Sequence, residues 1–231
     1  MIKNEKLLQE FRKMKDTDFM PLSVEAFEKM LIDNIREEAA KANGSKNKFT
    51  LVKKVLKASE KAYNGNGLHA DHAFLFSNPA TLPDGTKLNC FSQGHYILAS
   101  ANDFGIPDAK VPYNMNLYFQ DIPTKEKVVV DIADIKAFIK TKPKTKYNKN
   151  PYVIKYKNYL IGLDAEKLLD CLNFAGLDYF TFEPKKSLHG DYIVNPVYMA
   201  NDETKEFALL LPCNLGNGAT VDTRKADFVA A

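Results

Sequence analysis

The sequence has no tryptophan and only three cysteines in 231 residues. Cys90, Cys171 and Cys213 are far apart and odd in number, and no C-x-x-C pair occurs. This spacing excludes a disulfide framework and a paired-cysteine zinc site, so we expect reduced thiols and no structural metal. His69-Ala-Asp71-His72 superficially offers metal ligands, but no distant His or Cys completes a set with the usual spacing. We expect a polar strand entry there, and no cofactor.

Long apolar runs are also missing. No uninterrupted stretch approaches the roughly 20 residues that span a bilayer. The first residues, Met1 to Lys6, are charged from the start and lack the apolar core of a signal peptide. We therefore expect a cytoplasmic protein with no membrane contact.

The sequence contains no pattern typical of a catalytic site. The cysteines lie among apolar neighbours, where thiol pKa values rise rather than fall, and the carboxylates are mostly single and dispersed. The glycine-rich stretch from Asn64 to Gly67 follows a helical pattern rather than a strand, which argues against a phosphate-binding loop. We expect that the protein is not an enzyme.

Composition is that of a globular protein, with 45% hydrophobic and 26% charged residues, and the length allows one large domain or two ordinary ones. The net charge of +3 is small but unevenly distributed. Residues 136 to 157 contain eight lysines and no acidic residue, which leaves −5 for the remainder. Charge of this density repels itself unless an anion is present, which favours a phosphate-bearing partner.

Periodicity predicts helices in the first part of the chain. Residues 4 to 15 form a short amphipathic pattern, either a packing helix or a partner-binding arm. Ser23 is a good N-cap for a second helix that runs to about Ala42. Residues 49 to 62 form a third helix, with apolar residues on one face and lysines on the other. The region 1–44 is thus a helical N-terminal segment.

The rest of the sequence mixes strands and helices, which indicates an α+β protein. We expect strands at 73–76, 87–91, 92–99 and 116–119, with a turn at Pro83-Asp84-Gly85. A strand start at 128–130 and a helix capped by Asp131 or Asp134 follow. Further along come a hairpin at 152–161, a helix from Asp164 to Gly176, and a strand at 179–182. The Pro- and Asn-rich stretch 102–127 is the best boundary between domains of residues 45–122 and 123–231.

Two apolar runs between Tyr192 and Leu215 flank a polar connection at Asn201-Asp202, which predicts an antiparallel hairpin. The second run is nearly all apolar from Phe207 to Leu211, so we expect it to be buried on both faces. Pro212 cannot donate to a sheet ladder and belongs at the end of this strand.

Two short motifs in this chain resemble those of bacterial DNA polymerase sliding clamps, the beta subunits of DNA polymerase III. Residues 210–215, Leu-Leu-Pro-Cys-Asn-Leu, resemble the family's C-terminal Met-Pro-Met-Arg-Leu type sequence. Residues 93–97, Gln-Gly-His-Tyr-Ile, resemble its Thr-Asp-Gly-His-Arg-Leu-Ala type turn, with Gln93 and Tyr96 replacing the acid and the arginine. The likeness extends over 160–215 and 49–99 and implies antiparallel sheets with helices packed on one face, built from βαβββ-type units.

The resemblance also implies a pocket for a short hydrophobic peptide of a DNA polymerase or another replication protein. The alternative for its apolar residues is ordinary packing at a sheet edge. Asn214 replaces the family's arginine, which implies a changed peptide preference. The residues that the resemblance places in the pocket are Ser92, Gly94, His95, Tyr96, Ile97, Leu211, Pro212, Cys213, Asn214 and Leu215.

Sliding clamps contact duplex DNA through helices, and non-specific backbone contact suits basic faces without interleaved aromatics. The alternative is that these lysines simply solvate the surface. The lysines expected to contact DNA are Lys53, Lys54, Lys57, Lys61, Lys136, Lys140, Lys142, Lys144 and Lys146.

Three hypotheses follow from the sequence. The first is a sliding-clamp-like processivity factor, which would need to form a homo-oligomer because one chain of this length cannot encircle DNA. The second is a clamp-derived adaptor or inhibitor that keeps the peptide pocket without a ring. The third is an unrelated α+β nucleic-acid-binding protein.

Overall fold

The computed structural model describes residues 8–9, 24–42, 46–64, 75–141, 151–157, 159–187, 190–213 and 215. The chain divides into two units, Met1–Thr50 and Leu51–Ala231. The first unit holds helix α2 (Val24–Ala42) and the first residues of α3 (Lys46–Asn64), which continues into the second unit. Both helices agree with the predicted ones, although α3 begins three residues earlier. Of the helix expected at 4–15, only Leu8 and Gln9 are described, and both are helical.

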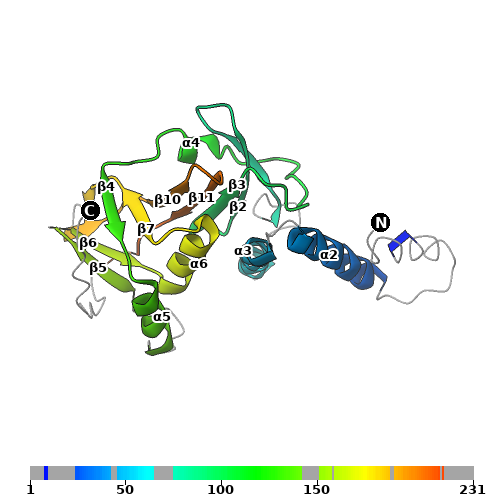
Figure 1. Ribbon diagram of the computed structural model, residues 1–231, viewed down its shortest axis with the longest axis horizontal. Coiled ribbons are helices and arrows are strands. Elements are labelled where there is room, and N and C mark those ends of the chain that lie inside the picture. The colour runs from blue at the N-terminus through cyan, green and yellow to red at the C-terminus, as the bar shows by residue number, and fades with distance from the viewer. Residues whose placement is uncertain are drawn as a thin grey trace. The chain divides into compact units, whose positions relative to one another are not determined.

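A seven-stranded sheet forms the centre of the second unit (Figure 1). All of its neighbouring strands pair antiparallel. Strand β11 lies in the middle, and strands from both sides of the boundary expected near residue 122 share this one sheet. In spatial order the strands are β1 (Asn78–Thr81), β2 (Lys87–Ser92), β3 (Tyr96–Ser100), β11 (Glu206–Leu210), β10 (Val197–Asn201), β7 (Tyr179–Phe182) and β4 (Glu126–Val129).

A second sheet has four strands, in the order β5 (Tyr152–Tyr156), β6 (Tyr159–Leu163), β9 (Gly190–Ile193) and β8 (Lys186–Ser187). The predicted β5–β6 hairpin is confirmed, and Lys157 adopts a positive φ of 50° in its turn. Tyr156 and Tyr159 pack edge-on against Phe182 of β7, which links this sheet to the larger one. The pairing of β6 with β9 is parallel, so this sheet is mixed.

Helix α6 (Ala165–Ala175) packs against β11, β10 and β3 on one face of the large sheet (Figure 1). Its sequence has a capping residue at each end of the helix. The carboxylate of Asp164 accepts hydrogen bonds from the N–H groups of Glu166 and Lys167, and Gly176 ends the helix with a φ of 68°. Helix α5 (Ile132–Thr141) packs against α6 and begins after Asp131, whose carboxylate accepts from the Ala133 N–H. The predicted caps Asp131, Asp164 and Gly176 are therefore confirmed. Among the described helices, none is long and apolar enough to cross a membrane.

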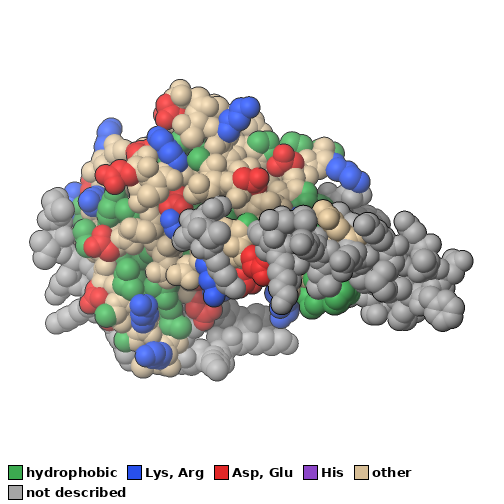
Figure 2. Space-filling view, turned by 45° about the vertical axis from the view of Figure 1, so that its right-hand side comes forward, with side chains coloured by type: hydrophobic (Ala, Val, Ile, Leu, Met, Phe, Trp, Pro, Cys, Tyr) green, Lys and Arg blue, Asp and Glu red, His purple; other side chains and the backbone are tan. Residues whose placement is uncertain are grey.

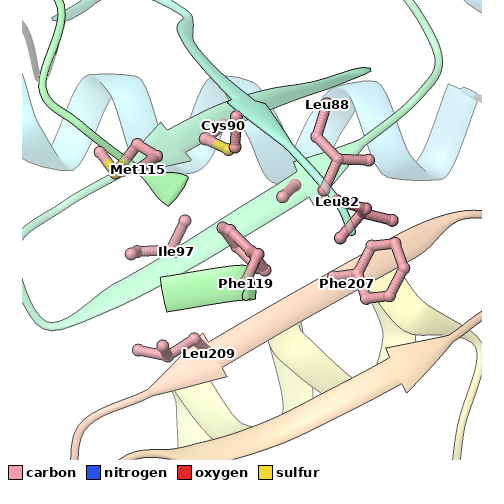
Figure 3. Close-up of a cluster of buried hydrophobic side chains, with 10 residues drawn as sticks. Leu82, Leu88, Cys90, Ile97, Met115, Phe119, Phe207 and Leu209 are labelled. Atoms are coloured by element: carbon pink, nitrogen blue, oxygen red, sulfur yellow. The ribbon is translucent and has the colours of Figure 1, made fainter. Parts of the chain in front are cut away.

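The other face of the sheet carries a compact apolar cluster beneath the short helix α4 (Asn116–Phe119) (Figure 3). Phe119 reaches from α4 toward Phe207 of β11, and the two rings meet edge to face with centroids 6.2 Å apart. With α6 on one face and this cluster on the other, every residue of β11 is buried. The expectation of a strand buried on both faces is confirmed for Phe207 to Leu210, and Leu211, just beyond the strand, is exposed.

Four predicted strands need correction. The strand expected at 92–99 is divided, because β2 ends at Ser92 and β3 begins at Tyr96. The strand expected at 73–76 begins instead at Asn78, and Leu75 and Phe76 lie outside it. Residues 116–119 form a helix rather than a strand, because the side chain of Asn114 accepts the Asn116 N–H and starts a helical turn. The run from Tyr192 does not continue into β10, because Pro196 interrupts it and residues 190–193 join the second sheet.

Polar contacts join helix α3 to the rest of the second unit. The Ser59 hydroxyl donates to the main-chain oxygen of Ser92 at 2.8 Å, and both residues are buried. Lys54 Nζ lies 2.6 Å from Asp170 Oδ2 on α6. Burial raises the pKa of Asp170, while its contact with Lys54 acts in the opposite direction. The ionised carboxylate therefore depends on the lysine.

Lys54→Met should leave the Asp170 carboxylate buried without its partner. We expect the free energy of unfolding at pH 7 to fall by about 1–3 kcal/mol, measured by urea denaturation. Because a raised folded-state pKa costs stability only where the group is ionised, the deficit should shrink as the pH falls toward 3.8, the ordinary Asp value. Lys57→Met, one turn away and exposed, should change stability by less than about 0.5 kcal/mol. A deficit that is equal at pH 4 and pH 7 would contradict this account.

Candidate functional site: an apolar groove beside the central strand

The Leu211 N–H donates a hydrogen bond of 2.9 Å to the main-chain oxygen of His95. Strand β11 pairs with β3 in a register that sets Leu210 opposite Tyr96, so this bond extends the ladder by one residue. The two sequence motifs, 116 residues apart at Leu211 and His95, are therefore side by side in the structure.

The tight turn between β2 and β3 presents His95 to this strand. The Gln93 N–H donates to the Tyr96 oxygen at 3.1 Å, and the Ser92 hydroxyl accepts the Gly94 N–H at 3.1 Å. Gly94 has a φ of +85°, a conformation that side chains with a Cβ rarely adopt. A glycine is therefore needed where the motif has one.

A cavity of about 250 Å³ opens between this turn, β11 and the chain leading into α4. Its walls come from three segments that are distant in the sequence. The lining residues are Ser92, Gly94, His95, Tyr96, Ile97, Tyr113, Asn114, Met115, Tyr118, Leu209 and Leu211.

Six of the ten residues assigned to a pocket from the sequence line this cavity: Ser92, Gly94, His95, Tyr96, Ile97 and Leu211. Beyond Leu211 the chain turns toward the second sheet. Pro212 is not among the lining residues, Cys213 donates its N–H to the Gly162 oxygen at 2.7 Å, and Leu215 packs with Val153 and Leu160. Cys213 and Leu215 therefore belong to the contact between this segment and β5–β6. Asn214 lies outside the described residues.

Sequence reasoning missed one wall of the cavity, made by Tyr113, Asn114, Met115 and Tyr118, together with Leu209 in β11. The segment 111–118 contains one proline and two asparagines, and it lies within the stretch 102–127 that the sequence predicts as a domain boundary. The signal that the sequence offered was the pair of tyrosines, Tyr113 and Tyr118, on either side of Met115.

The cavity is uncharged. Among its eleven lining residues none is Asp, Glu, Lys or Arg. Partial burial and the nearby charge of Lys167 lower the pKa of His95, and Asp164 opposes this only in part. The imidazole is therefore neutral near pH 7, and the surface favours an apolar ligand.

The three cysteines are unpaired, and burial raises the pKa of each thiol. This agrees with the expectation of unreactive thiols. Within the described ranges, no group of three or more His, Cys, Asp and Glu side chains could hold a metal ion. The His69-Ala-Asp71-His72 stretch lies outside those ranges.

The lysines assigned to DNA contact fall into three groups. Lys57 and Lys61 on α3 are exposed, as are Lys136 and Lys140 on α5, whereas Lys53 is partly covered and Lys54 pairs with Asp170. On the face shown in Figure 2, basic and acidic side chains of the described residues are interspersed. Lys142, Lys144 and Lys146 lie outside the described residues.

Comparison with known proteins gives one weak structural likeness. No family model matches the chain, and no curated protein matches it in sequence. The structure is similar to a DnaN sliding clamp (DNA polymerase III subunit beta) from Bartonella birtlesii bound to griselimycin, at 12% identity and a TM-score of 0.33. The match covers 56% of this chain and 42% of the clamp chain. At this TM-score the likeness does not establish a shared fold, so function is argued below from residues.

His95 should titrate below its ordinary pKa of 6.5 because burial and Lys167 disfavour the imidazolium ion. NMR of the imidazole protons, assigned with His95→Gln, measures the midpoint. Lys167→Met should raise that midpoint, since it removes the positive charge, whereas Lys185→Met should leave it in place. A midpoint at or above 6.5 in the unaltered protein would contradict the described environment.

Proposed function

We propose that this protein is a non-enzymatic, sliding-clamp-like factor that binds a short hydrophobic peptide of a replication protein in the groove beside β11. The observation that carries the proposal is the Leu211–His95 hydrogen bond. It brings together the two segments that resemble opposite walls of the clamp pocket, and an uncharged cavity lies where they meet.

The size and lining of the groove fit a weak, transient contact. A cavity of about 250 Å³ accommodates one or two side chains rather than a folded surface. Burying one large apolar side chain contributes about 1.5–3 kcal/mol, and a few such anchors dominate the affinity of short peptides. Affinity in roughly the micromolar range is expected for such an interface.

Contact with duplex DNA is the second part of the proposal. Lys57 and Lys61 project from α3 into solvent and are suited to phosphates rather than base edges. Because one chain of 231 residues is too short to encircle DNA, a ring would need several copies of the chain.

A clamp-derived adaptor without DNA contact is the second candidate. It is favoured by the Lys54–Asp170 pair, which engages one of the basic residues within the fold, and by the mixed charge in Figure 2. Salt-dependent binding to DNA distinguishes it from the first candidate, because counterion release accompanies phosphate contact.

Leu211→Asp should weaken peptide binding at least about tenfold, since a carboxylate in an apolar groove loses hydration without gaining a partner. Fluorescence anisotropy with a fluorescein-labelled hexapeptide carrying adjacent Leu and Phe measures this, and griselimycin serves as an unlabelled competitor. Leu117→Asp is the matched control, because Leu117 is exposed on α4 and does not line the cavity. Equal affinities of the unaltered protein and of Leu211→Asp for the peptide would refute peptide binding in the groove.

Lys57→Glu combined with Lys61→Glu should reduce binding to a short labelled duplex. The slope of log affinity against log salt should fall by about 1 for each lysine lost. Lys87→Glu with Lys125→Glu makes the same charge change at exposed positions elsewhere. If both double variants bind DNA equally weakly, only the net charge of the protein matters and α3 is not the contact surface. If the unaltered protein does not bind DNA, the result supports the adaptor without DNA contact.

A further inference from the structure

Exposed apolar side chains gather around the groove. Of the eight large apolar side chains that are exposed in the described part of the chain, three line it, namely Tyr113, Tyr118 and Leu211. Tyr113 and Tyr118 line the cavity yet are 42% and 41% exposed. Such concentration at a concave site is typical of a ligand-binding surface.

The tyrosine wall, defined as the lining residues Tyr113, Asn114, Met115 and Tyr118, belongs to a segment that hydrogen bonds fix to β1. The Tyr113 N–H donates to the side-chain oxygen of Asn78 at 2.8 Å, and the Asn116 side chain accepts the Thr81 N–H at 2.7 Å. The side chains of Met115 and Phe119 are buried in the cluster of Figure 3. The backbone that carries the rings of Tyr113 and Tyr118 is thus held in place, which reduces the entropy cost of binding.

The two sides of the groove differ in chemistry. On the β11 side Leu211 offers exposed aliphatic surface, while Ile97 and Leu209 are almost fully buried, and aliphatic surface does not distinguish aromatic from aliphatic ligands. Tyr113 and Tyr118 offer half-exposed rings, whereas the side chain of Met115, between them in the sequence, is buried. Ring–ring contacts add stabilisation beyond area burial, and an aliphatic ligand does not make them.

Building on the proposed function, we infer that the tyrosine wall makes this groove selective for a peptide whose anchor is an uncharged aromatic residue. The uncharged lining excludes acidic and basic anchors, and the wall favours a ring over a branched aliphatic chain. Tyr118 and Tyr113 are the specificity-determining residues.

The test uses two labelled hexapeptides that differ only in having Phe or Leu at the anchor position, titrated by anisotropy. The unaltered protein should prefer the Phe peptide by about fivefold. Tyr118→Leu keeps the apolar surface but removes the ring, so the preference should fall to near one while the Leu peptide still binds. Tyr118→Phe should keep the preference, and Leu117→Ala, in the same helix but outside the cavity, should leave both affinities unchanged.

The outcomes separate the two proposals. If both peptides bind the unaltered protein equally, or Tyr118→Leu weakens both by the same factor, the inference is overturned while the groove stands. If neither peptide binds, the proposed function is overturned together with the inference. A preference that is lost in Tyr118→Leu and kept in Tyr118→Phe supports the aromatic anchor.

Discussion

The burial of β11 on both faces is the constraint on which the rest of the second unit depends. This strand pairs with β3 on one side and β10 on the other, and α6 and the α4 cluster cover its two faces. Its backbone has no access to water, so its hydrogen bonds must be satisfied within the sheet. That requirement fixes the register with β3, and the register in turn brings Leu211 to His95.

The groove results from the way the pairing between β11 and β3 ends. At Leu211 the strand leaves the sheet, because Pro212 has no N–H to continue the pairing and the chain crosses to the second sheet. Leu211, the last residue that pairs with β3, is therefore partly buried and partly exposed. An apolar side chain in that position lines a cavity without filling it, and the turn at Gly94 closes the opposite side.

Local signals in the sequence were sufficient to predict much of the fold and part of the groove. The caps of α5 and α6, the β5–β6 hairpin and the buried strand carry strong short-range patterns, and two motifs placed six residues at one cavity. The sequence could not reveal the tyrosine wall, because residues 113–118 gain their position from β1, through the side chain of Asn78 and the main-chain N–H of Thr81. It also could not show that Cys213 and Leu215 pack on β6, since that depends on a contact between distant segments.

The position of β11 also bears on the order in which the molecule is assembled. It is central in the sheet, yet it follows all of its sheet neighbours along the chain. Until residues 206–210 have been synthesised, β3 and β10 each present an open edge, a state prone to pairing with other chains. Insertion of β11 removes both edges and forms the groove in one step. Nascent chains that lack β11 thus lack the wall of the groove that Leu209 and Leu211 form.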